Sequence, residues 1–254
     1  MRKILLLLFA CFLSACAAWP QEPVPESTIT TGTTETTAAT TAPATEPSAF
    51  PTTETTQPTV EETTQPAPEP EDGDFVRIQD YIPTALVRLA YATEENFTGV
   101  PIYGFTDAYL RYGTVKKLMQ AAEILEEQGF GILVWDAFRP VYAQQRLWDA
   151  YPDPAYVSPP GTGTQSHCRG CAVDVTLYDL QTGIPLEMPT GFDDFSRYAD
   201  RDYSDVPRKA AENAILLESV MAGCGFKPYR GEWWHFTDTQ SYGIEYDFDP
   251  ADNS

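Results

Sequence analysis

The alternation of hydrophobic and polar positions is regular only beyond about residue 73. Apolar residues recur on one helical face between 114 and 129, which predicts an amphipathic helix capped by Thr114. Segments 141–151 and 207–222 are also expected to be helical, and Pro140 suits the first turn of the former.

Shorter apolar runs predict strands between these helices. The runs of strand length are 86–91, 130–135, 172–178 and parts of 226–238. Helices and strands are mixed without a regular βαβ alternation, so we predict an α+β fold. We expect a single compact domain at 74–254, with a central, mainly antiparallel sheet flanked by helices.

The first residues read as a targeting segment. Two basic residues precede an apolar run, 4–13, that is too short to span a bilayer permanently. Residues 13–16, Leu-Ser-Ala-Cys, resemble a bacterial lipobox. We therefore predict a lipoprotein signal peptide at 1–15 and an acylated Cys16 that anchors the protein to the bacterial cell membrane, outside the cytoplasm. The alternative is an ordinary secretory peptide cut one or two residues later.

Residues 16–73 are rich in Thr, Pro and Glu and lack the apolar side chains that offset the entropy of ordering. We predict a disordered linker here, kept extended by proline and by like charges. The formal charge of the chain is −21, and ten of its acidic residues lie between Glu22 and Asp72, where no Lys or Arg occurs. Such acidity argues against nucleic acid as a partner.

The chain contains only two histidines, and each lies in a short motif with acidic residues. His167 is followed by Asp174 within a strand-like apolar run, and Glu232 precedes His235 by three residues. Two imidazoles and one carboxylate can hold a catalytic zinc and leave a fourth position for water, and Glu232 could act as its general base. Positions three apart in a regular strand face opposite ways, so the segment before His235 must turn or bulge. Taken singly, His235 could also be a hydrogen-bonded core histidine and Asp174 a capping residue.

The two motifs together, His-x-x-Gly-x-Ala-x-Asp and Glu-x-Trp-His, are similar to those of the zinc peptidases of the D-alanyl-D-alanine dipeptidase and carboxypeptidase group. The Trp-Trp form of the second motif resembles the dipeptidase branch. Segments 89–99, 135–140 and 188–193 also resemble that branch, so the similarity covers about 76–236.

This resemblance implies roles for individual residues. Zinc, one ion per chain, would be held by His167, Asp174 and His235. Glu232 would take the proton from the attacking water, and Arg139 would stabilise the oxyanion.

The resemblance also implies two contacts to substrate. Asp193 would hold the free ammonium group of a dipeptide, unless it is only a solvated loop residue. The family usually has a serine two places before the first histidine. This chain has Gln165 there, and the substrate contact is assigned to the adjacent Ser166.

Cys168 and Cys171 lie within the first motif, and a Cys-x-x-Cys pair can bind metal or act in redox chemistry. We favour neither role, because the adjacent histidine and carboxylates already account for a site. Outside the membrane these two thiols could bridge each other, or one could bridge Cys224.

The predicted function is zinc-dependent hydrolysis of D-alanyl-D-alanine to two D-alanines outside the membrane, in cell-wall peptide turnover. One alternative is a D,D-carboxypeptidase that trims peptidoglycan stem peptides. An alternative of another class is an inert wall-binding lipoprotein.

Overall fold

The computed structural model describes residues 68–154 and 156–253. The predicted signal peptide, Cys16 and almost all of the predicted linker lie outside the described residues, and the expected domain boundaries stay predictions. None of the helices in the described part of the chain is long and apolar enough to cross a membrane.

The centre of the fold is a five-stranded sheet with the order β2-β4-β5-β7-β6. β4, β5, β7 and β6 pair antiparallel along this order, and β2 pairs parallel with β4. A second, two-stranded sheet joins β1 to β3. The strands are β1 Phe75–Arg77, β2 Leu86–Val87, β3 Tyr109–Arg111, β4 Phe130–Asp136, β5 Ala172–Asp179, β6 Phe226–Pro228 and β7 His235–Asp238.

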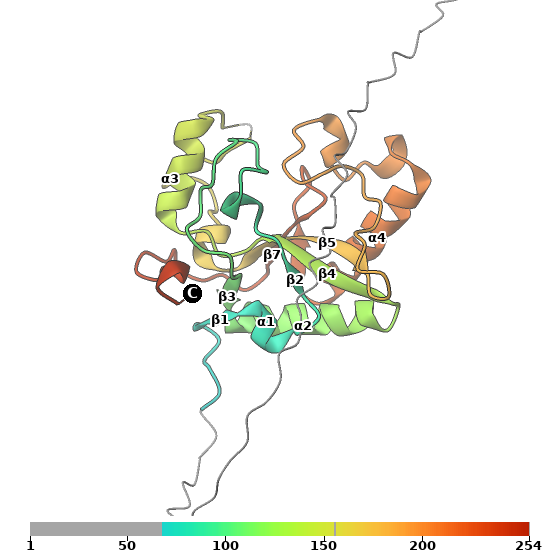
Figure 1. The fold of residues 1–254 in the computed structure, drawn as a ribbon, viewed down its shortest axis with the longest axis horizontal. Coiled ribbons are helices and arrows are strands. Elements are labelled where there is room, and N and C mark those ends of the chain that lie inside the picture. The colour runs from blue at the N-terminus through green and yellow to red at the C-terminus, as the bar shows by residue number, and fades with distance from the viewer. Residues whose placement is uncertain (1–67, 155, 254) are drawn as a thin grey trace, which may run out of the picture. The chain divides into compact units, whose positions relative to one another are not determined.

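Four α-helices surround the sheet, which confirms the predicted α+β class and the mainly antiparallel sheet (Figure 1). α2 and α4 contact each other, and they pack against β4 and against β5 and β6 respectively. The helices are α1 Ile78–Tyr81, α2 Tyr112–Glu126, α3 Val141–Ala150 and α4 Arg208–Gly223. Short 3-10 turns are η1 Ala90–Ala92, η2 His167–Arg169, η3 Arg197–Ala199, η4 Tyr203–Asp205 and η5 Pro250–Asn253.

The start of α2 differs from the prediction. The helix begins at Tyr112, and Thr114 lies inside its first turn instead of capping it. Thr114 is fully buried and donates its hydroxyl hydrogen to Oδ2 of Asp238 at 2.8 Å, and Lys117 binds the same carboxylate. The predicted cap is wrong because the helix starts two residues earlier, with Arg111 at its N-cap, so Thr114 is already inside the helix.

The strand expected at 86–91 is also shorter than predicted. β2 ends at Val87, and the chain turns through η1, which buries Tyr91. The carbonyl of Tyr91 accepts hydrogen bonds from the amides of Ile102 and Tyr103, both at 2.8 Å. The backbone therefore leaves the sheet to pair with a later loop.

β5 is the most deeply buried strand, since all of its residues except the last are buried. Val173, Val175 and Leu177 belong to the hydrophobic core, and Asp174 stands among them. An ionised carboxylate in such a place is costly unless it is paired or bound to a cation.

Candidate active site

Strand register brings three polar residues together at one end of the sheet. Asp174 on β5 is paired with Asp136 on β4 and with His235 on β7. Residues directly opposite each other in antiparallel strands project on the same face, so the strand register makes these side chains neighbours. β4 is irregular just before Asp136, which ends the regular pairing at this point.

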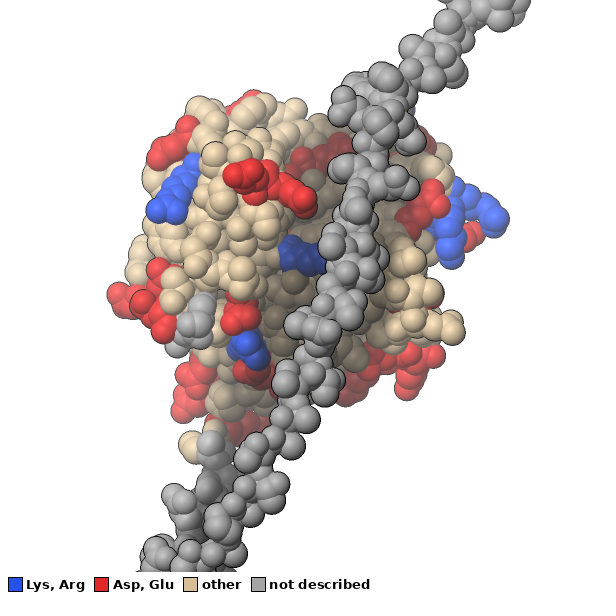
Figure 2. Space-filling view, in the orientation of Figure 1, with Lys and Arg blue, Asp and Glu red and all other residues tan. Residues whose placement is uncertain are grey.

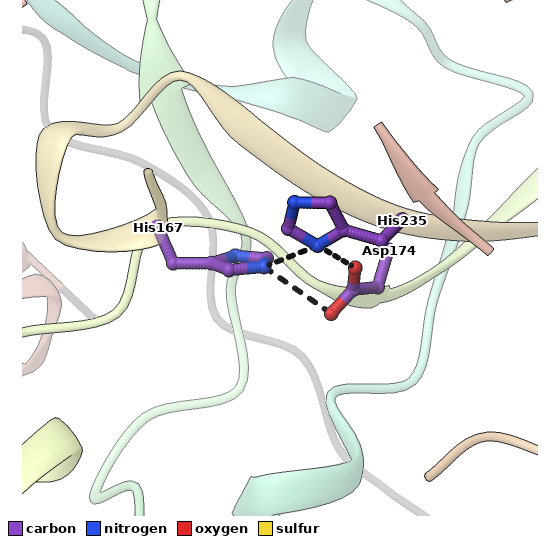
Figure 3. A group of neighbouring side chains, drawn as sticks. All are labelled: His167, Asp174 and His235. Atoms are coloured by element: carbon purple, nitrogen blue, oxygen red, sulfur yellow. Dashed lines mark hydrogen bonds and ion pairs between the residues drawn. The ribbon is translucent and has the colours of Figure 1, made fainter. Parts of the chain in front are cut away.

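The two histidines converge on Asp174, as Figure 3 shows. Nδ1 of His235 lies 2.9 Å from Oδ1 of Asp174, and Nε2 of His167 lies 3.3 Å from Oδ2. The two ring nitrogens are 3.2 Å apart. His167 comes from η2 and His235 from the start of β7, so residues far apart in the sequence offer their ligand atoms to one point. This group is a candidate metal site.

Hydrogen bonds on the far side of each ring fix which nitrogen faces this point. Nδ1 of His167 donates to the carbonyl of Ala137 at 2.7 Å, and Nε2 of His235 lies 3.0 Å from Oγ1 of Thr237. The carbonyl of Ala137 requires the hydrogen on Nδ1 of His167 and leaves the lone pair on Nε2 for a cation, and on His235 it is Nδ1 that faces the same point.

The electrostatics of the cluster follow from its burial. Burial raises the pKa of Asp174, but attraction by His167 and then His235 outweighs it and leaves that pKa below its usual value. Burial lowers the pKa of His167, whereas Asp174 and Asp136 raise it, and the net pKa is raised. The carboxylate of Asp174 is therefore charged at neutral pH and available as a ligand.

Glu232 lies in a turn that immediately precedes β7, as the predicted break in the strand requires. Its Oε2 is 3.9 Å from Nδ1 of His235, and its side chain is partly exposed to the cavity. Burial raises the pKa of Glu232 and is the largest effect. Attraction from His235 lowers it by less, so the net pKa is raised. Trp233 anchors the turn by donating from Nε1 to Oγ1 of Thr190 at 2.9 Å.

Arg139 is held rigidly beside the histidines. Its Nε and Nη2 donate to Oδ2 of Asp136 at 3.1 and 2.6 Å, and Nη1 donates to Oε1 of Gln144 at 2.9 Å. Its guanidinium lies over the ring of Tyr91 at 5.1 Å. Burial lowers the pKa of Arg139, but Asp136, Tyr103 and Tyr91 together outweigh it, so the net pKa is well above the ordinary value. The N-cap of α3 is Pro140, so Arg139 is not a helix cap.

Asp136, the buried partner of Arg139, is a site residue that the sequence motifs did not indicate. Asp136 is fully buried and accepts hydrogen bonds from the hydroxyl of Tyr103 at 2.6 Å and from the amide of Ala137 at 2.9 Å, in addition to those from Arg139. An acidic residue at the end of an apolar strand was the signal that could have found it. Gln144, on α3, had no such signal.

Asp193 also faces the cavity, across from the histidines. The hydroxyl of Tyr91 donates to its Oδ2 at 2.8 Å. Burial is the main cause that raises the pKa of Asp193 to about 7, although the bond from Tyr91 opposes it. Its φ of 53° is unusual for a residue other than glycine, and such strain is often stored at functional sites.

A cavity of about 330 Å³ connects these groups. Figure 2 shows that acidic side chains are more widespread than basic ones on the face drawn. Ser166 and Gln165 are both buried in the lining of the cavity, and Gln165 has a φ of 45°. The predicted site residues in the lining are Arg139, Ser166, His167, Asp174, Asp193, Glu232 and His235.

The cysteines of the described part of the chain are free thiols. Burial raises the pKa of both Cys168 and Cys171 to about 11. Thiols at such pKa values are protonated at neutral pH and are poor nucleophiles and metal ligands. Neither the bridge between these two nor one to Cys224 is present in the structure.

The chain is similar to several known proteins. Residues 71–249 match a protein family described as D-ala-D-ala dipeptidase. The D-alanyl-D-alanine dipeptidase of Escherichia coli is 36% identical over 163 residues, which are 64% of this chain and 83% of that protein. The enzyme of the same name from Streptomyces coelicolor is 36% identical over 65% of this chain and 91% of its own length, and that from Enterococcus faecium is 32% identical over 58% and 82%. The solved structure of the LdcB LD-carboxypeptidase, with a TM-score of 0.36 and 14% identity over 54% of this chain and 64% of that one, is too distant to add an argument.

Proposed function

The chain belongs to the D-Ala-D-Ala dipeptidase family of peptidases, and from that premise we propose that it hydrolyses D-alanyl-D-alanine to two D-alanines with one zinc ion. The observation that carries this proposal is the convergence of His167, Asp174 and His235 on one point beside Glu232 and Arg139. An inert wall-binding lipoprotein would have no use for a base and an oxyanion donor at the same point.

The three ligand atoms suit zinc. Two bonds of about 2.05 Å at a tetrahedral angle place ligand atoms about 3.3 Å apart. The two imidazole nitrogens are 3.2 Å apart, close to that separation. Oδ1 of Asp174 lies 2.9 Å from the nitrogen of His235 and Oδ2 lies 3.3 Å from that of His167, so either oxygen can complete the set. Two nitrogens and one oxygen leave a fourth position open, as catalytic zinc sites do. When bound, zinc supplies Lewis acidity and lowers the pKa of water toward neutrality.

Glu232 acts as the general base. It takes a proton from the attacking water and passes it to the leaving amine, so that the second D-alanine departs with a neutral amino group. A raised pKa brings this carboxyl closer to the pH at which it must both accept and release a proton. Glu232 lies in the turn before β7 and not in the strand itself. Its side chain can therefore lie next to His235, although residues three apart in a regular strand would face opposite sides.

Arg139 stabilises the negative charge that develops on the carbonyl oxygen. Asp136 and Gln144 together accept three of its five N–H groups and leave hydrogens on Nη1 and Nη2 for substrate. Because these partners fix the fork before substrate arrives, little reorganisation is needed in the transition state.

Asp193 recognises the free amino group. Its carboxyl is buried and held by Tyr91, and an ammonium cation beside it would restore the ionised form that burial disfavours. A buried acid without a cation partner favours a substrate with a free amino terminus over an acylated stem peptide. This is why we place the dipeptidase reaction ahead of the D,D-carboxypeptidase reaction. Ser166, beside His167, is the proposed contact to the rest of the dipeptide.

We also propose that the enzyme works outside the cytoplasm on peptides from wall turnover, anchored to the membrane by an acylated Cys16. Two basic residues, the apolar run 4–13 and the lipobox-like residues 13–16 support this location. Incorporation of labelled fatty acid into the full chain, and its loss in Cys16→Ala, tests it. A labelled Cys16→Ala variant would contradict the anchor.

The reaction is tested by incubating purified protein with D-Ala-D-Ala and measuring free D-Ala. We expect release that a chelator stops and added zinc restores. N-acetyl-D-Ala-D-Ala is the matched substrate, and we expect it to turn over at least tenfold more slowly. No release of D-Ala with zinc restored would contradict the proposed substrate.

A further inference from the structure

Four aromatic side chains form one contiguous cluster at the rim of the cavity, which we call the aromatic wall: Phe97, Tyr151, Tyr156 and Phe195. Three of them, all except Tyr151, line the cavity itself. They come from the loop after η1, the loop after α3 and the loop before η3. Tyr151, Tyr156 and Phe195 are 39%, 43% and 38% exposed, so this apolar surface is open to whatever enters the cavity.

Phe195 is the centre of the wall. Its ring centroid lies 4.6 Å from that of Tyr156, 5.3 Å from Phe97 and 5.9 Å from Tyr151, the last in a stacked arrangement. Tyr151 also contacts Phe97 and Tyr156, at 6.1 and 5.8 Å. Distances of this kind are favourable for aromatic pairs, so the three loops are fastened to one another through their rings.

The aromatic wall stands next to Asp193. Phe195 follows Asp193 by two residues on the same loop, and Phe97 contacts the ring of Tyr91 edge-on at 6.2 Å. The hydroxyl of Tyr91 is the donor to Asp193. The wall is therefore joined to the residue that would bind the amino group of a substrate.

We propose that the aromatic wall sets the length of the substrate by closing the cavity beyond the amino nitrogen of a bound dipeptide. A further residue attached to that nitrogen would have to pass through the space that Phe195 and Tyr156 occupy. This inference rests on the proposed function, because it presumes that Asp193 marks the amino end of D-Ala-D-Ala.

Length selection by the rings is separable from charge selection by Asp193. The tripeptide Gly-D-Ala-D-Ala keeps an ammonium group but carries it one residue further out. Replacing an aromatic side chain with a smaller one should therefore speed tripeptide cleavage only if the ring blocks the extra residue sterically. Asp193→Asn removes the charge preference and leaves the rings in place. The two kinds of variant thus change different steps of recognition.

The test measures kcat/KM for D-Ala-D-Ala and for Gly-D-Ala-D-Ala with zinc-loaded full chain. We expect the wild type to prefer the dipeptide, and Phe195→Ala and Tyr156→Ala to shift the ratio toward the tripeptide by at least tenfold. Tyr246→Ala is the matched control, since Tyr246 is 74% exposed and lies outside the cavity lining, and its ratio should not move. Phe195→Leu keeps much of the packing volume, and with it a folded loop, and should shift the ratio in the same direction by a smaller factor.

Three outcomes overturn the proposal. A wild type that cleaves both peptides equally has no length selection to explain. Unchanged ratios in Phe195→Ala, Phe195→Leu and Tyr156→Ala, with the dipeptide still cleaved, refute the wall and leave the proposed function standing. A wild type that cleaves no dipeptide refutes the proposed function, and the wall falls with it.

Discussion

The ligand end of the cavity and its recognition end are built from different kinds of structure. At the ligand end, Asp174 and His235 sit opposite each other on paired strands, and η2 carries His167 beside them. At the recognition end, Asp193 and the aromatic wall come from loops, and Asp193 has a left-handed backbone. Strand register fixes atoms within narrow limits, whereas loops tolerate change. The comparison indicates that the sheet fixes two of the three proposed metal ligands, Asp174 and His235, whereas the proposed substrate contacts come from loops.

The largest effect should come from the ligand end. His167→Ala removes one of three ligand atoms and leaves Asp174 with one imidazole partner. We expect both bound zinc and D-Ala release to fall below detection, because three protein ligands are the usual minimum of a catalytic zinc site. Metal analysis of the purified variant checks this. One zinc per chain in His167→Ala would show that the metal is held elsewhere.

Glu232→Gln separates the base from the metal. The variant keeps the shape of the side chain but cannot accept a proton, so we expect kcat to fall by about 10²–10⁴ while one zinc per chain remains. The pair of measurements is zinc content and steady-state kinetics. Full activity in Glu232→Gln would mean that another group takes the proton.

Arg139→Lys tests the fixed fork. Lysine keeps the positive charge but cannot hold Asp136 through two nitrogens and Gln144 through a third. We expect kcat to fall by about 10²–10³ with a smaller change in KM, which is the range for loss of an oxyanion donor. A change confined to KM would instead assign Arg139 to ground-state binding.

Asp193→Asn should have the smallest effect of these variants and should act mainly on KM. Loss of one charged hydrogen bond predicts about a tenfold to hundredfold increase in KM for D-Ala-D-Ala. The pKa of Asp193 is raised to about 7, so its carboxylate, and with it ammonium binding, should be gained as pH rises through 7 in the free enzyme. The acidic limb of kcat/KM near that pH should be lost in Asp193→Asn. A limb unchanged in Asp193→Asn would assign it to Glu232 instead.

The sequence predicted the fold class and the cluster of His167, Asp174 and His235 better than it predicted the contacts of Arg139 and the aromatic wall. Family and fold class were predictable because the two histidine motifs and the mixed order of elements are local patterns. That His167, Asp174 and His235 would meet followed from the same motifs, and the structure brings them together. Their roles as ligands stay predictions until metal is measured.

The partners that hold Arg139 were less predictable. Asp136 had a signal, as an acidic residue at the end of an apolar strand, but its contact with Arg139 depends on where β4 ends. Gln144 had none, because its contact depends on how α3 packs. The aromatic wall joins three loops that lie far apart in the sequence, so no motif could define it. Thr114 is not a cap because the helix begins at Tyr112, and its bond to Asp238, on a strand more than a hundred residues away, could not be read from the sequence either.

X-ray absorption at the zinc edge of the purified enzyme tests the central claim most directly. The account predicts two imidazole nitrogens and light oxygen ligands at about 2.0–2.2 Å. A sulfur shell at about 2.3 Å would place the metal on Cys168 or Cys171, and would contradict a site built from His167, Asp174 and His235.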